Sequence, residues 1–278
     1  MSNIAIFLLI VLAPIYAAFF EGAQRVLKAK MQRRIGPPLM QPFYDMYKLM
    51  DKRALMVNKT HTLFALFYFF TLWILIAFIF LGFNLLYIIF LHLLASIILI
   101  LAGFSVKSIF SHIGSNRKLL AIVAYEPILL LISVGIYMVY GTFEISVILN
   151  TPSQFLSLIF VYFAIILIIP AITKLSPFDA PKAHQEIVGG IEIEYGAIFY
   201  EFLYAAKFLE MIFAYSFIYI LAGDNHIFGT FLVLFSFLLV NLIDNSTARI
   251  QISHMVKVIL VLGIVLCSIN ILGSLLWA

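Results

Sequence analysis

Long apolar segments are the feature that most limits what this chain can fold into. A helix needs about 20 mostly apolar residues to cross the ~30 Å hydrocarbon core of a bilayer. Only 11% of the 278 residues are charged, against about 25% in a typical soluble domain. We therefore expect an all-α, polytopic membrane protein that forms one integral-membrane domain over residues 1–278. Eight segments qualify as spans: residues 3–20, 62–81, 85–104, 119–139, 155–172, 197–221, 227–243 and 256–277.

Two details of these segments bear on how the chain enters the membrane. The first has no basic residue ahead of it and is too long for the apolar region of a signal peptide, so we expect it to be retained. The second and third are separated only by Gly82, Phe83 and Asn84, which must form a tight turn.

The basic residues lie on one side of this topology. Apart from Lys207, every Lys and Arg falls in or at the border of an alternate loop. By the positive-inside rule these loops face the cytoplasm and both termini lie outside, as in a multi-pass protein of the plasma membrane. This placement accounts for the net charge of +4 without nucleic acid. The four basic loops are residues 21–61, 105–118, 173–196 and 244–255.

The first basic loop contains an amphipathic pattern that indicates a short helix at the membrane surface. Either a simple anchor or a helix docked against a partner protein fits this pattern. Its apolar side is Leu39, Met40, Phe43, Met46, Tyr47 and Met50, and its polar side is Asp45, Lys48, Asp51 and Lys52.

Carboxylates at membrane depth are the first candidates for function, because an ionised side chain there costs roughly 2.5 to 3.5 kcal/mol on insertion scales. Glu126 precedes Pro127, which is expected to loosen the helix one turn earlier. Lys207 and Glu210 are three residues apart, so we expect an ion pair on one face. We expect Glu194 and Glu201, seven apart, to share another face. A purely structural role, as satisfied polar groups between helices, stays open for each.

The segment SPFDAPKAHQEIVGGIEIEYG, residues 176–196, is the most acidic part of the chain. Its prolines exclude a continuous helix, and its adjacent glycines allow turns closed to other residues. Apolar residues are mixed into it, so we expect a folded loop packed against something. Its acidic residues are Asp179, Glu186, Glu192 and Glu194.

The residue inventory argues against a redox or hydrolytic centre in this chain. Cys267 is the only cysteine, which is too few for an iron–sulfur cluster. His92 is the only histidine well inside a span, so a haem held between helices is not supported. No metal-binding or phosphate-binding motif is present in the sequence. We assign no catalytic residue and no metal ligand.

Four ordered motifs make the chain resemble a known family. They are RRIGPP from Arg33, QPFYDMYKL from Gln41, YEP from Tyr125 with Arg117 before it, and PFDAP from Pro177 followed by EIVGGIEIEY from Glu186. In that order they resemble the membrane subunit 1 family of respiratory complex I. This family includes the membrane subunits of energy-converting nickel–iron (NiFe) hydrogenases and formate hydrogenlyases.

The resemblance implies a subunit without its own redox centre, which joins a peripheral redox arm to an ion-translocating membrane arm. The NiFe centre and iron–sulfur clusters would belong to partners: the hydrogenase large and small subunits and a ferredoxin-like subunit at the inner face. Antiporter-like subunits would adjoin it in the membrane. The motifs and the charged spans together give the ion-path or coupling residues as Glu126, Asp179, Glu186, Glu192, Glu194, Glu201, Lys207 and Glu210. The docking residues of the first loop are Arg33, Arg34, Gln41, Asp45 and Lys48.

Two departures from the quinone-reducing members favour a hydrogenase-type complex coupling electron transfer to H⁺ or Na⁺ translocation. Only Pro38, Leu39 and Met40 separate the first two motifs, where those members have a longer insert, and Lys207 stands where they usually have a glutamate. The nearest alternative is the quinone-site subunit of a complex I-like dehydrogenase. A stand-alone secondary transporter is more distant, because such proteins often show paired repeats with broken helices.

Overall fold

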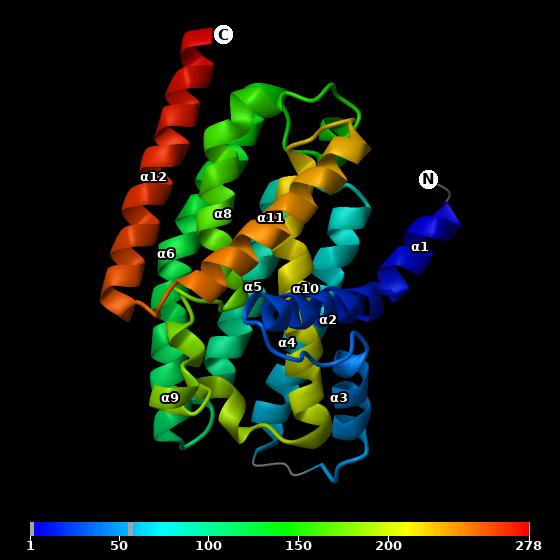
Figure 1. The fold of residues 1–278 in the computed structure, drawn as a ribbon, viewed down its shortest axis with the longest axis vertical. Helices are drawn as coiled ribbons and strands as arrows, with labels where there is room; N and C mark the ends of the chain where they lie inside the picture. Colours follow the sequence, from blue (N-terminus) through cyan, green and yellow to red (C-terminus); the bar gives the residue numbers. More distant parts are fainter. Residues whose placement is uncertain (1–2, 55–57, 278) are drawn as a thin grey trace.

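The computed structural model describes residues 3–54 and 58–277 (Figure 1). Within these ranges the chain is helical, and the one β-type contact is an isolated bridge between Asn84 and Glu144. The expected all-α class is confirmed. The α-helices are α1 (Asn3–Val11), α2 (Ala13–Met31), α3 (Gln41–Met50), α4 (Lys59–Phe80), α5 (Leu85–Phe104), α6 (Ile109–Tyr140), α7 (Ile145–Ile148), α8 (Ile159–Thr173), α9 (His184–Ile187), α10 (Ala197–Ile220), α11 (His226–Ser246) and α12 (Ile252–Trp277); the short 3₁₀ turns are η1 (Phe155–Leu158), η2 (Ala180–Lys182) and η3 (Gly190–Glu194).

Seven helical segments among the described residues are long and apolar enough to cross a membrane. They are α4, α5, α6, η1 with α8, α10, α11 and α12, and each overlaps one of the segments expected from residue 62 onward. The tight turn between α4 and α5 is present: Gly82 has a φ of 77°, and the Asn84 side chain caps α5 by accepting a hydrogen bond from the Leu86 amide. The polytopic membrane architecture is therefore confirmed.

The first expected span, residues 3–20, differs from a single helix. It is divided between α1 and α2, which meet at Leu12. Pro14 lies in the first turn of α2, where a proline is tolerated because its missing amide has no intrahelical partner there. In Figure 1, α2 crosses the bundle at a steep angle and α1 leads away towards the N-terminus. The helix also continues to Met31, well into the stretch expected to be loop.

Helix α6 begins ten residues before the expected span, so Arg117 and Lys118 lie on a helix and not in a loop. At 1.5 Å per residue, its 32 residues reach about 48 Å, which exceeds the ~30 Å hydrocarbon layer. The expected loosening at Pro127 does not interrupt α6, which is continuous through it. The N-terminal half of α6 therefore carries charged side chains up to and into the bundle.

Helix α10 lies at the centre of the bundle. It packs against α2, α3, α4, α8 and α11, and the side chains of Phe208, Phe213 and Phe217 are fully buried. The loop between α8 and α10 lies at the same end of the molecule as α3 (Figure 1) and packs through η2, α9 and η3 against α6. Of the charged residues on α10, Glu210 is consequently held fully inside protein, while Glu201 and Lys207 are half-buried.

Candidate functional site

A cluster of charged and hydroxyl side chains joins α2, α3 and α10. We call it the first-loop cluster and define it as Glu21, Arg25, Asp45, Tyr204 and Lys207. Arg25 binds Asp45 at 2.8 Å and Glu21 at 3.2 Å, and it donates a 2.6 Å hydrogen bond to the Tyr204 hydroxyl. The Tyr204 hydroxyl in turn donates to Asp45 at 2.9 Å. Arg25 therefore ties the surface helix α3 to two helices of the bundle.

Asp45 faces inward, which corrects the expectation that it belongs to the exposed polar side of α3. Gln41 also donates to its carboxylate, at 2.9 Å. Partial burial opposes ionisation of Asp45, but the hydrogen bonds from Arg25, Gln41 and Tyr204 outweigh burial and lower its pKa. Phe43 and Met46 are half-buried on α3, as expected, whereas Tyr47 and Met50 are exposed.

Lys207 and Glu210 do not form the expected ion pair. Lys207 extends to Glu21 of α2, 3.2 Å away, while Glu210 faces α6 and α8. Three helical positions leave the two side chains about 60° apart around α10, and each finds a partner on a different neighbouring helix. The pairing is therefore between helices and not along one.

Glu210 is the centre of a buried ion triad. Its two carboxylate oxygens lie 3.6 Å from the Lys118 ammonium and 3.3 Å from the Lys174 ammonium. The side chain of Glu210 is 0% exposed, that of Lys118 2% and that of Lys174 7%. Among the described residues neither oxygen meets the geometry of a hydrogen bond, and the two ammonium groups offset the cost of burying the charge. A change of charge on any member must alter the other two.

A second buried pair lies on the same helix as Lys118. Glu126 contacts His92 of α5 at 2.7 Å, and the His92 ring is stacked on Phe213. Lys118 also donates a 3.3 Å hydrogen bond to the Tyr125 hydroxyl. Helix α6 thus links the Glu210 triad to the Glu126–His92 pair through Tyr125, the residue adjacent to Glu126.

The acidic loop is folded as expected, with Phe178, Ile187 and Ile191 buried. Gly189 and Gly190 have φ values of 101° and 64°, which side chains rarely adopt. A Cβ on Gly114 of α6 would lie only 2.7 Å from the Gly190 Cα. Glycines on both sides therefore let the loop backbone approach α6.

Two acidic residues of the loop, Asp179 and Glu186, are held by arginines. Asp179 makes a two-pronged contact with Arg249 at 2.7 and 2.6 Å, and Glu186 binds Arg117 at 2.5 Å and Arg249 at 3.5 Å. The hydrogen bond from Arg117 lowers the pKa of Glu186, and the hydrogen bond to Asp179 raises the pKa of Arg249. We call these four residues the arginine clamp. It joins the segment that precedes α12 and the N-terminal part of α6 to the loop.

Glu192 lies deeper and connects the loop to the triad. It pairs with Lys182 at 2.5 Å. Burial opposes ionisation of Glu192, but the positive charges of Lys182 and Lys174 outweigh burial and lower its pKa. A cavity of about 20 Å³ is lined by Glu192, Lys182, Lys174 and Lys118. This volume fits about one water, and four charged groups are ample partners for it.

The other predicted residues are less connected. Glu194 and Glu201 are half-buried and take part in no ion pair within residues 3–54 and 58–277. Their expected shared face is wrong, because η3 ends at Glu194 and the extended Gly196 separates it from α10. Arg33, Arg34 and Lys48 are exposed, and their docking role stays a prediction.

Several site residues were missed as functional candidates in the sequence. In the sequence, Lys118 and Lys174 served only to assign the cytoplasmic side of the membrane. His92 served only in the argument against a haem. Glu21 fell just beyond the first expected span. Its spacing to Arg25 (i, i+4) was the one available signal for that pair, because such residues face each other on a helix.

The long apolar helices define this chain as an all-α membrane protein. Its distinguishing feature is a set of ion pairs that lead from a folded acidic loop into the helical bundle. The model of the NADH dehydrogenase family matches residues 4–275, and the chain belongs to that family. The expected resemblance to the membrane subunit 1 family is thereby confirmed.

Two curated relatives illustrate the match. NADH-ubiquinone oxidoreductase chain 1 of Neurospora crassa is 30% identical over 236 residues, which are 74% of this chain and 62% of the relative. An NADH-quinone oxidoreductase subunit of Frankia alni is 34% identical over 113 residues, which are 39% of this chain and 25% of the relative. This chain thus matches less than two thirds of the length of either relative.

One solved structure shares the whole fold. It is a chain of a membrane-bound sulfane sulfur reductase, described as an archaeal respiratory membrane complex. The TM-score is 0.88 at 21% identity, with 97% of this chain and 99% of that chain covered. At this identity the likeness concerns the fold.

Proposed function

We propose that this chain is the membrane subunit that links the peripheral redox arm to the ion-translocating arm of a membrane-bound, NiFe hydrogenase-type respiratory complex. In this role it couples electron transfer to translocation of H⁺ or Na⁺ across the plasma membrane, with the basic loops on the cytoplasmic side. The observation that carries the proposal is the series of ion pairs from the acidic loop to Glu210 inside the bundle.

The outer part of this series supplies a surface for the redox subunits. The Glu186 side chain is 47% exposed although it is held by two arginines. The exposed Tyr44, Tyr47 and Met50 of α3 lie at the same end of the molecule and offer aromatic and thioether contacts. The hydrogenase subunits and their ferredoxin-like partner would dock here, and a shift at this surface would bear directly on the arginine clamp.

The inner part of this series of ion pairs would carry the electrostatic change from the docking surface into the membrane. A shift in Glu192 alters the field on Lys174, and thereby the balance of the triad around Glu210. Lys118 is shared between Glu210 and Tyr125, so the change reaches Glu126 and His92. Interhelical ion pairs with alternative partners are the kind of two-state element that coupling between distant sites requires. The antiporter-like subunits would receive the change beyond this chain.

A second candidate is the quinone-site subunit of a complex I-like dehydrogenase. The names of the curated relatives favour it, since they are NADH-ubiquinone and NADH-quinone oxidoreductase subunits. The short connection between the first two motifs, the lysine at position 207 and the near-complete mutual coverage with the sulfane sulfur reductase chain favour the first.

Purification of the intact complex separates these functions. We expect NiFe content and hydrogen evolution with reduced dye. Inhibitor-sensitive quinone reduction without nickel would support the second candidate. Reduction of sulfane sulfur without hydrogen evolution would contradict the hydrogenase assignment and leave the coupling role in place. Ion transport by the isolated chain in liposomes would instead indicate a stand-alone transporter.

A further inference from the structure

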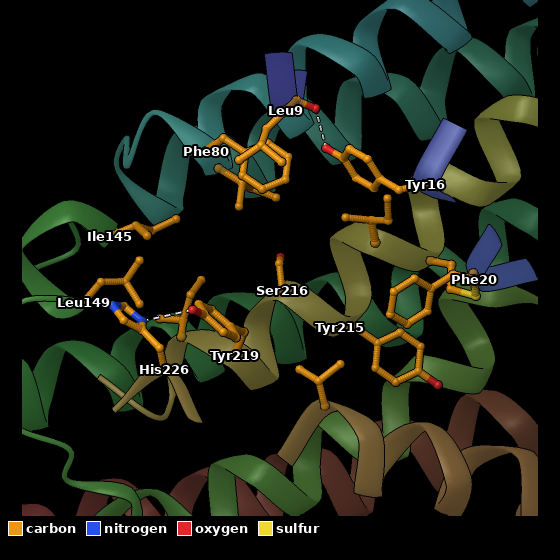
Figure 2. A pocket seen from close by; sticks show the side chains of 15 residues that line it. Leu9, Tyr16, Phe20, Phe80, Ile145, Leu149, Tyr215, Ser216, Tyr219 and His226 are labelled. Carbon is orange, nitrogen blue, oxygen red and sulfur yellow. Dashed lines mark hydrogen bonds between the residues drawn. The ribbon is translucent and has the colours of Figure 1, made fainter. Parts of the chain in front are cut away.

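A pocket of about 430 Å³ lies where α10 ends and α11 begins, away from the acidic loop that precedes α10; Figure 2 shows the side chains that line it. Its wall comes from α1, α2, α4, α10 and α11 and from the segment around α7, and it is almost wholly apolar. Phe80, Ile145 and Leu149 line one side, and Tyr16 and Tyr215 the other. The volume falls within the range of about 300–1,000 Å³ that is usual for small-ligand sites.

The pocket lies at membrane depth, because α4, α10 and α11 are three of the membrane-spanning helices. Ile79, Phe80 and Tyr16 on its wall are only partly buried, so it opens to the surface of the bundle. Ser216 points into its centre, and its hydroxyl is satisfied by donating to the Phe213 carbonyl. The interior therefore suits a hydrocarbon chain and makes no polar demand on it.

One end of the pocket is polar. The Tyr219 hydroxyl and the Nδ1 of His226 are 2.9 Å apart, and the two rings are parallel. His226 also lines an open surface depression with Asp224, Asn225 and Ile227. Tyrosine is typical of the boundary between hydrocarbon and headgroups. Because His226 lines both the pocket and the depression, Asp224 lies next to the polar end of the apolar pocket, which suits an amphiphile with one chain inside and its head beside Asp224.

The charge around the pocket and its size limit which kind of ligand can occupy it. The neighbouring segments, residues 141–154 and 221–226, contain no Lys or Arg, and they contain Glu144 and Asp224. A net anionic head would be repelled there, whereas an ammonium group would be attracted to the exposed Asp224 carboxylate. The volume of about 430 Å³ is that of a small-ligand site, which suits a single hydrocarbon chain.

We propose that this pocket is a lipid-binding site, which holds one hydrocarbon chain of a bilayer lipid whose zwitterionic head carries an ammonium group near Asp224. The lipid would fill the space beneath the junction of α1 and α2 and brace these helices against α10. The site is separate from the arginine clamp and the Glu210 triad, so it does not depend on the proposed function.

Photolabelling of the purified complex tests this assignment. The complex is reconstituted into vesicles of equal parts phosphatidylethanolamine and phosphatidylglycerol, doped with either lipid carrying a diazirine in one chain. We expect the ethanolamine probe to label peptides containing residues 9–20 and 211–220 at least threefold more than the glycerol probe. Ser216→Phe fills the pocket and should abolish this labelling. Val261→Phe adds bulk on the exposed face of α12 and should leave it unchanged.

Asp224→Asn supplies a second measurement that does not depend on folding of the filled variant. Asparagine keeps the oxygen that accepts the Ser153 amide and removes only the charge. We expect the preference for the ethanolamine probe to fall towards equality. Labelling equal in wild type and Ser216→Phe, labelling of a partner subunit in place of lipid, or a preference for the glycerol probe would each overturn the proposal.

Discussion

Glu210 shows most clearly how single residues set the behaviour of this protein. Its carboxylate separates two buried ammonium groups that would otherwise repel each other. The side chain is 0% exposed, so solvent does not screen the interaction. Removing one charge from the triad is therefore expected to cost stability. For the same reason, the triad should respond strongly to a change of charge nearby.

Glu210→Gln should destabilise the protein by roughly 3 to 5 kcal/mol, because it leaves two buried lysines without a compensating charge. Thermal unfolding in detergent measures the effect. Glu210→Gln combined with Lys174→Gln should recover part of the loss, and the exposed Glu144→Gln should show none. A single variant as stable as wild type would show that the Glu210 carboxylate does not stabilise the two lysines.

Asp45 gives a pH dependence whose sign is fixed by its contacts. Its pKa lies below the ordinary value near 3.8, because Arg25, Gln41 and Tyr204 bind the charged form. A group with a lowered folded-state pKa stabilises the fold above its unfolded pKa and loses that contribution as pH falls through its folded pKa. We therefore expect the protection factors of the α3 amides, which compare measured with intrinsic exchange rates, to fall below about pH 4, and Asp45→Asn to show lower protection already at neutral pH. Equal protection in the variant at neutral pH would contradict the account.

Residue partners were the least predictable part of the site. The sequence identifies Lys207 and Glu210 as unusual, but Lys207 pairs with a residue 186 positions away. A helical periodicity reports only neighbours on the same helix. Which face of α10 meets α2, and which meets α6 and α8, depends on packing of the whole bundle.

At the scale of elements, hydropathy predicted the membrane helices from residue 62 onward, because their apolar runs are bounded by polar or turn-forming residues. It did not predict the junction between α1 and α2, since Leu12 and its neighbours are as apolar as the helices they separate. The start of α6 was also displaced, because Arg117 and Lys118 resemble loop residues until their partners in the acidic loop and on α10 are known.

Contact between the acidic loop and α6 makes a prediction at this scale. Gly114→Ala places a methyl group against the Gly190 backbone and should detach the loop, although alanine favours the helix itself by up to about 1 kcal/mol. Gly273→Ala on α12, whose Cβ meets no atom within 4 Å, is the matched control. Limited proteolysis within residues 176–196 should accelerate in the first variant only. Equal cleavage rates in both variants would show that close backbone approach does not hold the loop.

At the scale of the whole molecule, the charges form a graded series from the exposed Glu186, through Glu192, to the fully buried Glu210. Helix α6 contributes Arg117, which binds Glu186, and Lys118, which binds Glu210. It also carries Glu126, which extends the series to His92. The described residues thus offer a route for an electrostatic change from the acidic loop to the interior of the helical bundle.

Ion accumulation measured together with hydrogen evolution in sealed vesicles tests this coupling most directly. In Glu126→Gln and Glu192→Gln complexes, we predict that dye-linked hydrogen evolution stays close to wild type while ion accumulation falls to the uncoupled background. Glu144→Gln should retain both activities. Unchanged ion accumulation per hydrogen evolved in both test variants would contradict the coupling role of these carboxylates.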